Sequence, residues 1–353
     1  MSLEELRKKI DGLDSQILRL LNRRAEAILE IGKLKAGQRA DYYSPSREEE
    51  VYRRLARENR GPFPQEALRA IYREIISGSR SLQKRLKIAY LGPEATFTHM
   101  AAQEKFGSSC DYIPAKSIPD VFAEVAKDRA DYGVVPVESS TEGVISYTLD
   151  MFTDSELKVS SEIFLEISQN LLANCKLEEV KRVYSHPQAI AQSRLWVESH
   201  LPQAEIIEVF STAQAAQLAS KEKNSAAIAS RLAAQLYGLE IISERIEDNP
   251  QNFTRFLVIG KGLSEPSSKD KTSIMFAIKD RVGALYDILG PFARHNINLT
   301  KIESRPTKKK PWEYIFFVDL EGHVADNRVR RAMDEVEKEC LSFKVLGSYP
   351  AGR

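Results

Sequence analysis

The feature that most constrains this chain is an uninterrupted helical pattern at its N-terminus. Leucine and isoleucine recur at spacings of mostly three and four from Leu3 to Leu34, and residues 1–36 contain no proline. A helix of about 33 residues is roughly 50 Å long, which is too long to be covered by its own small domain. A pattern beyond about 25 residues without caps is typical of a coiled-coil-like pairing. We therefore expect a second copy of the chain to pack against this helix.

Two shorter helices are predicted to complete an all-helical segment over residues 1–85. Ser44 is suited to the N-cap and Pro45 to the first helical position of the second helix, which is expected to end near Asn59. Pro64 opens the third helix. The apolar stripe of this third helix consists of Leu68, Ile71, Ile75, Ile76 and Leu82.

The pattern changes over residues 86–262, where short β-rich runs alternate with helical stretches. The predicted strands are residues 88–91, 132–135, 182–184, 206–209, 226–229 and 254–259. Alternation of this kind favours parallel sheets with crossover helices. The length suffices for two small α/β lobes, and ligands of such folds bind outside the carboxyl ends of the strands.

A polar stretch with glycine and proline, residues 261–271, is predicted to be a linker to a third module over residues 271–353. The predicted elements of this module follow the order βαββαβ, which is the ferredoxin-like arrangement. They are strand 272–278, helix 283–295, strand 298–304, strand 313–320, helix 326–340 and strand 343–349. A module of this size fits a regulatory domain better than an enzyme.

Composition narrows the class of protein. The net charge of the 353 residues is +1, and neither a strongly basic segment nor an interleaving of cations with aromatics indicates nucleic-acid binding. There is no run of about 18 apolar residues to cross a membrane, and the N-terminus lacks the pattern of a secretory signal. The three cysteines are far apart, which predicts neither a disulfide framework nor a metal site. A reducing cytoplasm is the expected compartment.

Cationic side chains on the first helix are candidates for an anion site. Arg24 and Lys35 are eleven residues apart and fall within about 20° on one helical face, whereas Arg7 points elsewhere, toward the site of a partner chain. Polar candidates on the other two helices are Arg47, Glu48, Ser79 and Gln83. Spacing alone fits a solvated helix surface at least as well as a site.

The order of residues over the whole helical segment favours a binding site over a solvated surface. Residues 6–14, 20–24, 31–35, 44–48 and 73–83 resemble, in order and spacing, the all-helical chorismate mutase family. Chorismate is a dianion that rearranges to prephenate without nucleophile, base or cofactor, so the catalyst must hold a compact conformer and stabilise charge on the ether oxygen. The resemblance implies that Arg24 and Arg7 of the partner subunit clamp the carboxylates. Arginine suits this role because its planar fork pairs bidentately.

The same resemblance implies roles for five more residues. Lys35 and Gln83 would hydrogen-bond the ether oxygen, and Glu48 would hold the ring hydroxyl. Arg47 and Ser79 would line the pocket.

Five polar clusters follow predicted strands of the middle segment, at residues 92–98, 136–143, 185–192, 211–213 and 254–256. Hydroxyls and backbone N–H groups at strand-to-helix joins can bind carboxylates, although any one cluster is equally explained by helix capping. His99 and His186 are expected to serve as turn or cap residues rather than as bases. Because neither GxGxxG nor GxxxxGK[ST] occurs, the sequence gives no support for a dinucleotide-binding site or a P-loop.

Taken together, these clusters resemble prephenate dehydratase across roughly residues 87–260. That reaction removes carbon dioxide and the ring hydroxyl from prephenate, and a positioned proton donor assists the departure of the hydroxyl. The resemblance implies that Thr254 donates or relays this proton. The residues implied to bind the substrate or brace the site are Glu138, Ser139, Ser185, Gln192 and Arg255.

The third module resembles the ACT regulatory domain over residues 272–350. In that family, segments matching residues 283–285 and 303–306 form phenylalanine sites between paired domains. A glycine at a helix start lets backbone N–H groups approach a ligand carboxylate. The predicted phenylalanine contacts are therefore Gly283, Ala284, Leu285, Asn296, Glu303, Ser304 and Arg305.

The whole chain thus resembles the P-protein family, in which a chorismate mutase, a prephenate dehydratase and an ACT domain follow one another. This implies an all-α domain over residues 1–85, a two-lobed, periplasmic-binding-protein-like α/β domain over 86–262 and a ferredoxin-like domain over 271–353. The implied protein is a cytoplasmic enzyme of phenylalanine synthesis that needs no metal or organic cofactor. It would bind chorismate, prephenate and L-phenylalanine, and would form a homodimer or a tetramer.

Two alternatives remain open at this point. Arogenate carries an amino group where prephenate carries a keto group, and no motif distinguishes the two substrates. The second alternative is a non-catalytic phenylalanine sensor with decayed enzyme domains. Ser44 and Ser139, where the two families usually have Asp and Asn, would be the marks of such decay.

Overall fold

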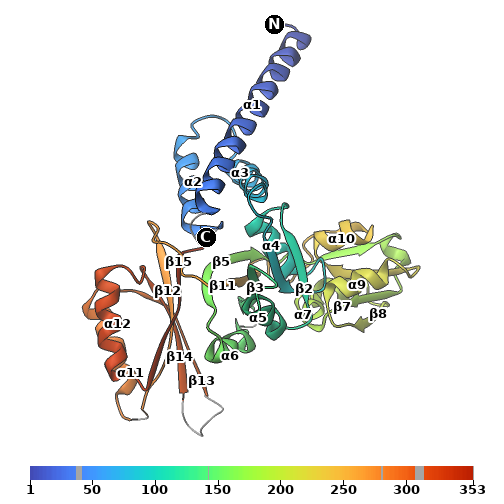
Figure 1. Ribbon diagram of the computed structural model, residues 1–353. Helices are drawn as coiled ribbons and strands as arrows, with labels where there is room; N and C mark the ends of the chain where they lie inside the picture. The colour runs from blue at the N-terminus through green and yellow to red at the C-terminus, as the bar shows by residue number, and fades with distance from the viewer. Residues whose placement is uncertain (37–41, 142, 280, 307–313, 353) are drawn as a thin grey trace. The chain divides into compact units, whose positions relative to one another are not determined.

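The computed structural model describes residues 1–36, 42–141, 143–279, 281–306 and 314–352, with the backbone alone for residues 35 and 36. The chain folds into two compact units (Figure 1). Unit 1 consists of Met1–Leu86 and Lys105–Asp111, and unit 2 consists of Lys87–Glu104 and the chain from Tyr112 onward. No helix of the described residues has the length and apolar character needed to cross a membrane.

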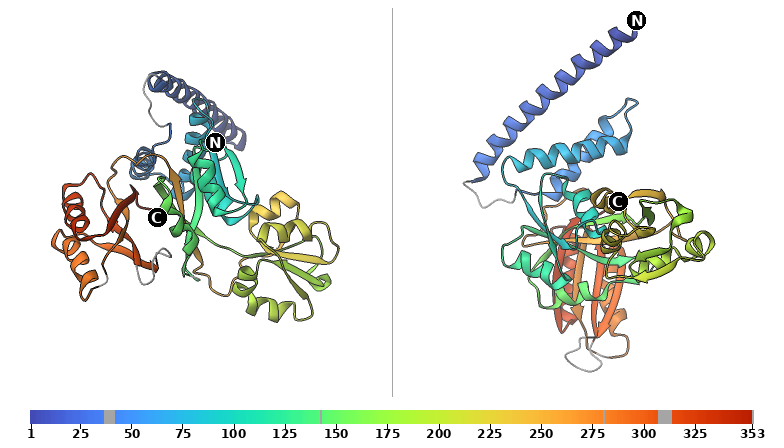
Figure 2. Two further views of the ribbon diagram at one scale, coloured as in Figure 1. Left: turned by 60° about the horizontal axis from the view of Figure 1, so that its bottom comes forward. Right: turned by 90° about the vertical axis from the view of Figure 1, so that its right-hand side faces the viewer.

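Unit 1 contains the three predicted helices, which confirms the all-helical prediction: α1 (Leu3–Ala36), α2 (Pro45–Glu58) and α3 (Gln65–Ser81). Ser44 caps α2 as expected, since its hydroxyl accepts a hydrogen bond from the Arg47 backbone N–H at 3.4 Å. The N-terminal part of α1 extends beyond α2 and α3 (Figure 2, right). Its leucines and isoleucines, from Leu3 to Ile17, are therefore largely exposed.

A segment from far along the sequence completes unit 1. Residues Lys105–Asp111 belong to this unit, although the sequence grouped them with the middle domain. The Phe106 ring packs on Tyr43 with a centroid distance of 4.9 Å. The Ser108 backbone N–H donates to Glu74 at 2.9 Å, and that of Ser109 donates to the Ser77 hydroxyl at 3.1 Å. These contacts attach the segment to α3.

The first lobe of unit 2 is built on a sheet with the strand order β2-β1-β3-β11-β5, with β4 paired to β3. Helices α5 and α6 pack on it through an apolar core in which the rings of Phe122 and Phe152 meet edge to face at 5.2 Å. The elements are β1 (Lys87–Leu91), α4 (Phe97–Phe106), β2 (Asp111–Ala115), α5 (Ile118–Ala126), β3 (Tyr132–Ser139), β4 (Gly143–Val144), α6 (Ser146–Asp154), β5 (Lys158–Glu166) and β11 (Phe253–Gly260).

The second lobe has a sheet with the order β10-β6-β9-β7-β8. Its core is rich in alanine from α9, α10 and β9, and such small side chains allow helices to approach the sheet closely. The elements are β6 (Asn170–Ala173), a 3₁₀ turn (Leu177–Glu179), β7 (Arg182–Ser185), α7 (Pro187–Gln192), α8 (Arg194–His200), β8 (Glu205–Glu208), α9 (Thr212–Ala219), β9 (Ser225–Ala229), α10 (Arg231–Tyr237) and β10 (Glu240–Ser243).

The expectation of parallel sheets is wrong for part of each lobe. Strands β1 and β3 are parallel, as are β7, β8 and β9. However, β11 runs antiparallel to both β3 and β5, and β6 runs antiparallel to β9 and β10. The chain leaves the first lobe after β5 and returns to it through β11, which reverses the direction of that strand. Strand β5 escaped prediction because it buries Ser160, Ser161 and Glu162 instead of an apolar run.

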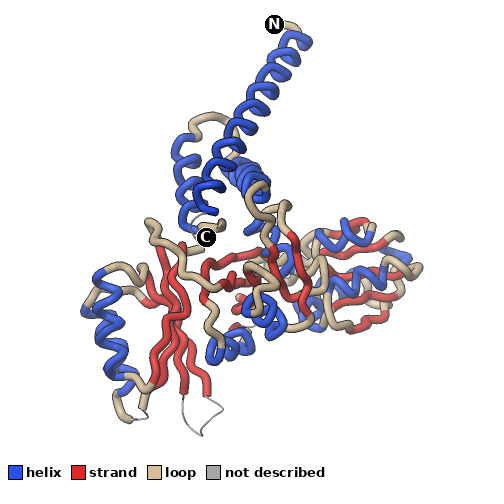
Figure 3. Tube along the Cα trace, viewed as in Figure 1, coloured by secondary structure: helices blue, strands red, loops and turns tan. Residues whose placement is uncertain are grey.

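The C-terminal part of unit 2 confirms the βαββαβ prediction. Its antiparallel sheet has the order β13-β14-β12-β15, and both helices cover one face of it (Figure 3). The elements are β12 (Asp270–Ala277), α11 (Ala284–Arg294), β13 (Leu299–Pro306), β14 (Tyr314–Glu321), α12 (Asn327–Glu339) and β15 (Ser342–Pro350).

The other face of this sheet packs on the first lobe. Leu346 and Tyr349 of β15 are buried in the same apolar core as Val159 of β5. Glycine is required at position 347, since a Cβ there would lie 2.1 Å from the Val159 carbonyl oxygen. The predicted linker is also anchored, because the buried Ser264 hydroxyl donates to the Ser160 carbonyl at 2.8 Å.

Candidate active sites and regulatory site

Three of the predicted mutase residues come together where α1 crosses α3. The Arg24 guanidinium donates to the Ser79 hydroxyl at 2.6 Å. The Gln83 side-chain amide donates to the Ile28 carbonyl, which lies one turn further along α1. Partial burial lowers the pKa of Arg24, with Tyr72 opposing the shift, and the side chain stays cationic because an arginine pKa is far above neutrality. The crossing therefore presents one cation and two polar groups in a small volume.

Glu48 lies in the first turn of α2 and faces α3. Its Oε1 accepts a hydrogen bond from the Arg80 guanidinium at 2.7 Å, and the two side chains are 13% and 6% exposed. Burial raises the pKa of Glu48, and Arg80 is the largest opposing influence. Burial by itself would lower the pKa of Arg80, but Glu48 together with Cys110 and Tyr43 raises it. The pair is therefore an ionic one with little access to solvent.

The remaining predicted mutase residues are not brought to this place in the single chain. Arg47 is exposed and forms an ion pair with Glu50 at 2.5 Å, because its side of the first turn of α2 faces solvent. Arg7 is exposed and stands seventeen residues before Arg24 on the same helix, a rise of about 26 Å. The side chain of Lys35 lies outside what the structure describes.

In unit 2, Thr254 and Ser139 face each other on adjacent strands. They are directly paired in the antiparallel ladder of β11 and β3, and paired residues present their side chains on the same face. Thr254 is half-buried, and no hydrogen bond of its hydroxyl is found among the described residues. The Ser139 and Thr141 hydroxyls lie 3.0 Å apart. This face of the first lobe therefore carries a row of hydroxyl groups.

Gln192 joins that row to the second lobe. Its amide N–H₂ donates to the Thr141 hydroxyl at 3.1 Å, while its carbonyl oxygen accepts from Asn252 at 3.0 Å and from Gln169 at 3.1 Å. Asn252 immediately precedes β11, and Gln169 immediately precedes β6. The polar groups of both lobes thus meet beside Thr254.

Ser185 and the two histidines have structural partners. The Ser185 hydroxyl is fully buried and donates to the Ile228 carbonyl at 2.7 Å, so it fixes β7 against β9 rather than facing a cleft. His186 caps α7 through Nδ1, which accepts from the Gln188 N–H at 3.3 Å. His99 stacks on Tyr90 and accepts from the Ala95 N–H at 3.1 Å. The prediction that both histidines are turn or cap residues is confirmed.

Glu138 and Arg255 neighbour the hydroxyl pair in sequence but lie on the opposite face of the sheet. They are paired with each other across β3 and β11, and side chains alternate along a strand. Arg255 is 7% exposed. It contacts Asp319 at 2.6 Å, Glu162 at 2.7 Å and the Tyr349 hydroxyl at 3.2 Å. The geometry favours the predicted bracing role for these two residues over direct substrate contact.

This network connects the first lobe to the C-terminal sheet. Lys271 binds Glu162 at 2.8 Å, and Lys301 binds Glu138 at 2.7 Å. Burial opposes the charge of Arg255, but Tyr349, Asp319 and Glu162 raise its pKa above the ordinary value. The charged groups surround a cavity of about 290 Å³. Buried ion pairs therefore link the C-terminal sheet to Arg255, the residue next to Thr254.

The predicted phenylalanine residues occupy two places in the C-terminal sheet domain. Gly283 is the N-cap of α11 with φ of +80°, a conformation that favours glycine, and Ala284 begins the helix. Glu303, Ser304 and Arg305 lie in the last part of β13, which is an edge strand of the sheet. Asn296, with φ of +53°, turns the chain between these places. Arg305 binds Asp150 of α6 at 3.1 Å.

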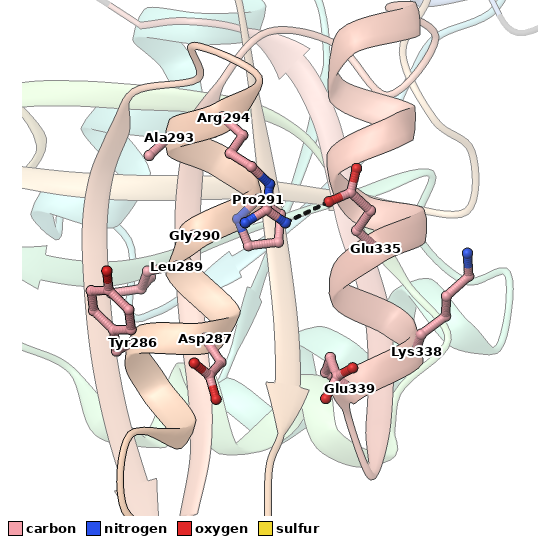
Figure 4. Close-up of a pocket in the computed structure, with 10 residues that line it drawn as sticks. All are labelled: Tyr286, Asp287, Leu289, Gly290, Pro291, Ala293, Arg294, Glu335, Lys338 and Glu339. Carbon is pink, nitrogen blue, oxygen red and sulfur yellow. Dashed lines mark hydrogen bonds and ion pairs between the residues drawn. The ribbon is translucent and has the colours of Figure 1, made fainter.

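A separate hollow of about 650 Å³ lies between α11 and α12 (Figure 4). Arg294 and Glu335 face each other across it at 2.7 Å. None of the seven predicted phenylalanine residues lines it. The hollow is therefore distinct from the predicted regulatory site.

Sequence reasoning missed several residues that the tertiary structure brings into these sites. They are Arg80, Thr141, Glu162, Gln169, Asn252, Lys271 and Asp319. A signal existed for three of them: Thr141 lies in the polar cluster at residues 136–143, Asn252 stands two residues before Thr254, and Arg80 directly follows Ser79. Nowhere in the described ranges do three or more His, Cys, Asp or Glu residues gather in a way that could hold a metal ion.

Three known families match successive parts of the chain. Residues 6–84 match the family described as "Chorismate mutase type II", and residues 88–263 match "Prephenate dehydratase". Residues 272–338 match "ACT domain".

Individual relatives resemble the chain over most of its length. A bifunctional chorismate mutase/prephenate dehydratase of Aquifex aeolicus is 52% identical, over 99% of this chain and 98% of the relative. One of Pseudomonas aeruginosa is 41% identical, over 99% and 97%. Among solved structures, prephenate dehydratase of Arthrobacter aurescens in complex with L-Phe has a TM-score of 0.70 and 35% identity, over 75% of this chain and 90% of that one.

Proposed function

The chain belongs to the family of bifunctional chorismate mutases/prephenate dehydratases, and we propose that its parts act in series to supply phenylpyruvate for phenylalanine synthesis under feedback control. It is an enzyme that rearranges chorismate to prephenate and then dehydrates and decarboxylates prephenate. The similarity to bifunctional relatives over almost the whole chain carries this conclusion. We assign the mutase to residues 1–85, the dehydratase to 86–262 and the ACT domain to 271–353.

For the mutase reaction, the crossing of α1 and α3 is the proposed site. Arg24 would bind a carboxylate of chorismate, and its contact with Ser79 holds the guanidinium fork in place. Gln83 and Lys35 would stabilise the charge that develops on the ether oxygen. Glu48 would accept a hydrogen bond from the ring hydroxyl through the oxygen that Arg80 does not occupy.

The site would be completed by a second copy of the chain. Arg7 would serve the partner's site, since it is about 26 Å along α1 from Arg24 of its own chain. The exposed apolar residues along the N-terminal part of α1 support this pairing, because such a stripe is stable only when covered. We propose a homodimer on this basis, with a tetramer as the larger form.

For the dehydratase reaction, Thr254 is the proposed proton donor to the departing ring hydroxyl. Its own hydroxyl is available to a substrate, and Ser139 stands opposite to it across the ladder. Gln192 and Thr141 would bind substrate carboxylate oxygens between the two lobes. Ser185, Glu138 and Arg255 would brace this arrangement from behind.

Feedback by L-phenylalanine would act through the buried ion pairs around Arg255. The structure of the Arthrobacter aurescens relative contains L-Phe. In this chain, Asp319 and Lys301 of the ACT sheet bind the residues adjacent to Thr254 and Ser139. Phenylalanine would have to favour one arrangement of the ACT domains over another, since a ligand shifts an equilibrium only by its differential affinity.

The cytoplasm is the proposed compartment. All three cysteines, Cys110, Cys175 and Cys340, are free, which suits a reducing environment.

The testing experiment measures phenylpyruvate formed from chorismate by the purified protein, with and without L-phenylalanine. Product that falls when millimolar phenylalanine is added supports both activities and their regulation. Accumulation of prephenate would contradict the dehydratase assignment, and a parallel assay with arogenate then tests the other substrate. Bound phenylalanine with untouched chorismate would identify a sensor without enzyme activity.

A further inference from the structure

Arg80 is a buried arginine with a hydrogen-bond partner on each of its two terminal guanidinium nitrogens. It donates to Glu48 at 2.7 Å and to the Phe106 carbonyl at 2.9 Å, and it lies 3.7 Å from the Cys110 sulfur. The rings of Tyr43 and Phe106 lie 5.3 and 5.8 Å from its central carbon. At 6% exposure it is too enclosed to bind a substrate itself. Glu48 is its acidic partner.

Two of the residues that enclose Arg80, Phe106 and Cys110, come from the segment Lys105–Asp111. Phe106 supplies both a carbonyl and a ring, and Cys110 supplies the sulfur. Glu74 attaches the segment to α3 by accepting from the Ser108 hydroxyl at 2.6 Å and from its backbone N–H at 2.9 Å. This segment lies inside the region that matches prephenate dehydratase. Part of the dehydratase sequence therefore fixes a side chain of the mutase helices.

Glu48 would not be a fixed carboxylate without this support. Its surroundings in unit 1 are Arg80 and Arg69 from α3, Lys105 from the segment, Tyr52 from its own helix and, more weakly, Cys110. Burial favours the neutral acid, and Arg80 is the strongest charge that opposes it. Arg80 also occupies Oε1, so Oε2 is the oxygen left for another donor.

We propose that Arg80, held by the segment Lys105–Asp111, is a positioning residue of the mutase site that keeps Glu48 ionised and directs its second oxygen toward the ring hydroxyl of chorismate. The proposal rests on the proposed function in one respect, the contact between Glu48 and the substrate. It makes the two activities structurally dependent, because the mutase needs residues that follow its own domain in sequence.

The test compares Arg80→Gln with Arg85→Gln in the full-length protein. Arg85 also binds the segment, through Asp111 at 2.9 Å, but it is 61% exposed and does not contact Glu48. Mutase kcat and KM are measured for both variants from pH 5 to pH 9, with dehydratase activity on prephenate as the control for folding. Arg80→Gln should lower mutase kcat/KM by about tenfold or more, the effect of losing a charged hydrogen bond. Arg85→Gln should stay near the wild-type value.

The pH profile distinguishes a positioning role of Arg80 from a purely structural one. Loss of Arg80 raises the pKa of Glu48 further, so KM for chorismate should begin to rise at a higher pH than in the wild type as the pH falls. Arg80→Lys keeps the charge and should restore the profile while recovering only part of kcat/KM. A wild-type profile and kcat/KM in Arg80→Gln would overturn the proposal.

Two further measurements test the role of the segment and the pKa of Glu48 separately. Glu74→Ala loosens the segment without changing Arg80, so the pH profile of KM should shift in the same direction by a smaller amount. An unchanged profile would refute the role of the segment. Carbon-13 NMR of protein with labelled glutamate measures the pKa of Glu48 without turnover. The Glu48 signal is assigned as the one that disappears in Glu48→Gln. If the wild type rearranged no chorismate, the proposed function would fail, whereas the NMR shift would still support or overturn the role of Arg80.

Discussion

Replacing Asp319 by asparagine removes one charge from the network around Arg255 while keeping the size of the side chain. The Arg255–Asp319 contact is 2.6 Å long, and the two side chains are 7% and 9% exposed, so solvent screens it little. Removing one partner of a buried ion pair costs about 3–5 kcal/mol when the other charge is left uncompensated. Because Glu162 stays paired with Arg255, the substitution should destabilise unit 2 by a smaller amount, about 1–2 kcal/mol. For a body of this size, that corresponds to a fall in Tm of about 2–8 °C.

The effect on activity should follow the position of Arg255. Because Arg255 directly follows Thr254 in β11, a looser guanidinium should lower dehydratase kcat and weaken inhibition by phenylalanine. The mutase should be unaffected, since its residues belong to unit 1. Thermal unfolding is followed by calorimetry, and both activities are assayed on the same preparation.

The matched control is Asp128→Asn. Asp128 forms an ion pair with Lys261 at 2.6 Å in the same unit, but its side chain is 79% exposed, and such surface pairs contribute about 0–1 kcal/mol. If the two variants showed the same Tm, dehydratase kcat and phenylalanine response, the reasoning from burial would be refuted.

Three further substitutions test the assignments. Thr254→Ala should abolish dehydratase turnover and leave the mutase intact, because Thr254 belongs to unit 2 and lies outside the segment Lys105–Asp111; joint loss of both activities in a folded variant would contradict the assignment of Thr254 to the dehydratase site alone. Arg24→Ala should abolish mutase turnover, whereas Arg23→Ala, at the exposed neighbouring position, should not; near wild-type activity of the first variant would disprove the assignment. Gly347→Ala places a Cβ 2.1 Å from the Val159 carbonyl, so unit 2 should lose about 1–3 kcal/mol of stability, and an unchanged Tm measured by calorimetry would contradict the close packing of β15 on β5.

Local patterns were sufficient for much of the fold. The three-four spacing from Leu3 to Leu34 predicted α1, and Ser44 before Pro45 predicted the start of α2. The C-terminal βαββαβ order was predicted as well. In each case the determining forces act within a few residues of one another, through side-chain periodicity or through a cap on the adjacent backbone.

The alternation of side chains along β11 was a local signal that went unused. It places Thr254 and Arg255 on opposite faces, which separates the proposed proton donor from its neighbour in the same motif. The sequence could have excluded a shared role for these two residues, although it could not identify what each one faces.

The partners across the fold were decided by the tertiary structure alone. Arg80 meets Glu48 and Phe106, and Arg255 meets Glu162 and Asp319, over separations of 26 to 93 residues. The amino-acid sequence determined which of these residues are charged and on which helices and strands they lie. Which charges are buried together depends on the path of the chain, including the return through β11 and the packing of residues 105–111 on α3. A buried ion pair forms only where that path brings both partners out of water at once, and no spacing rule along the sequence contains that information.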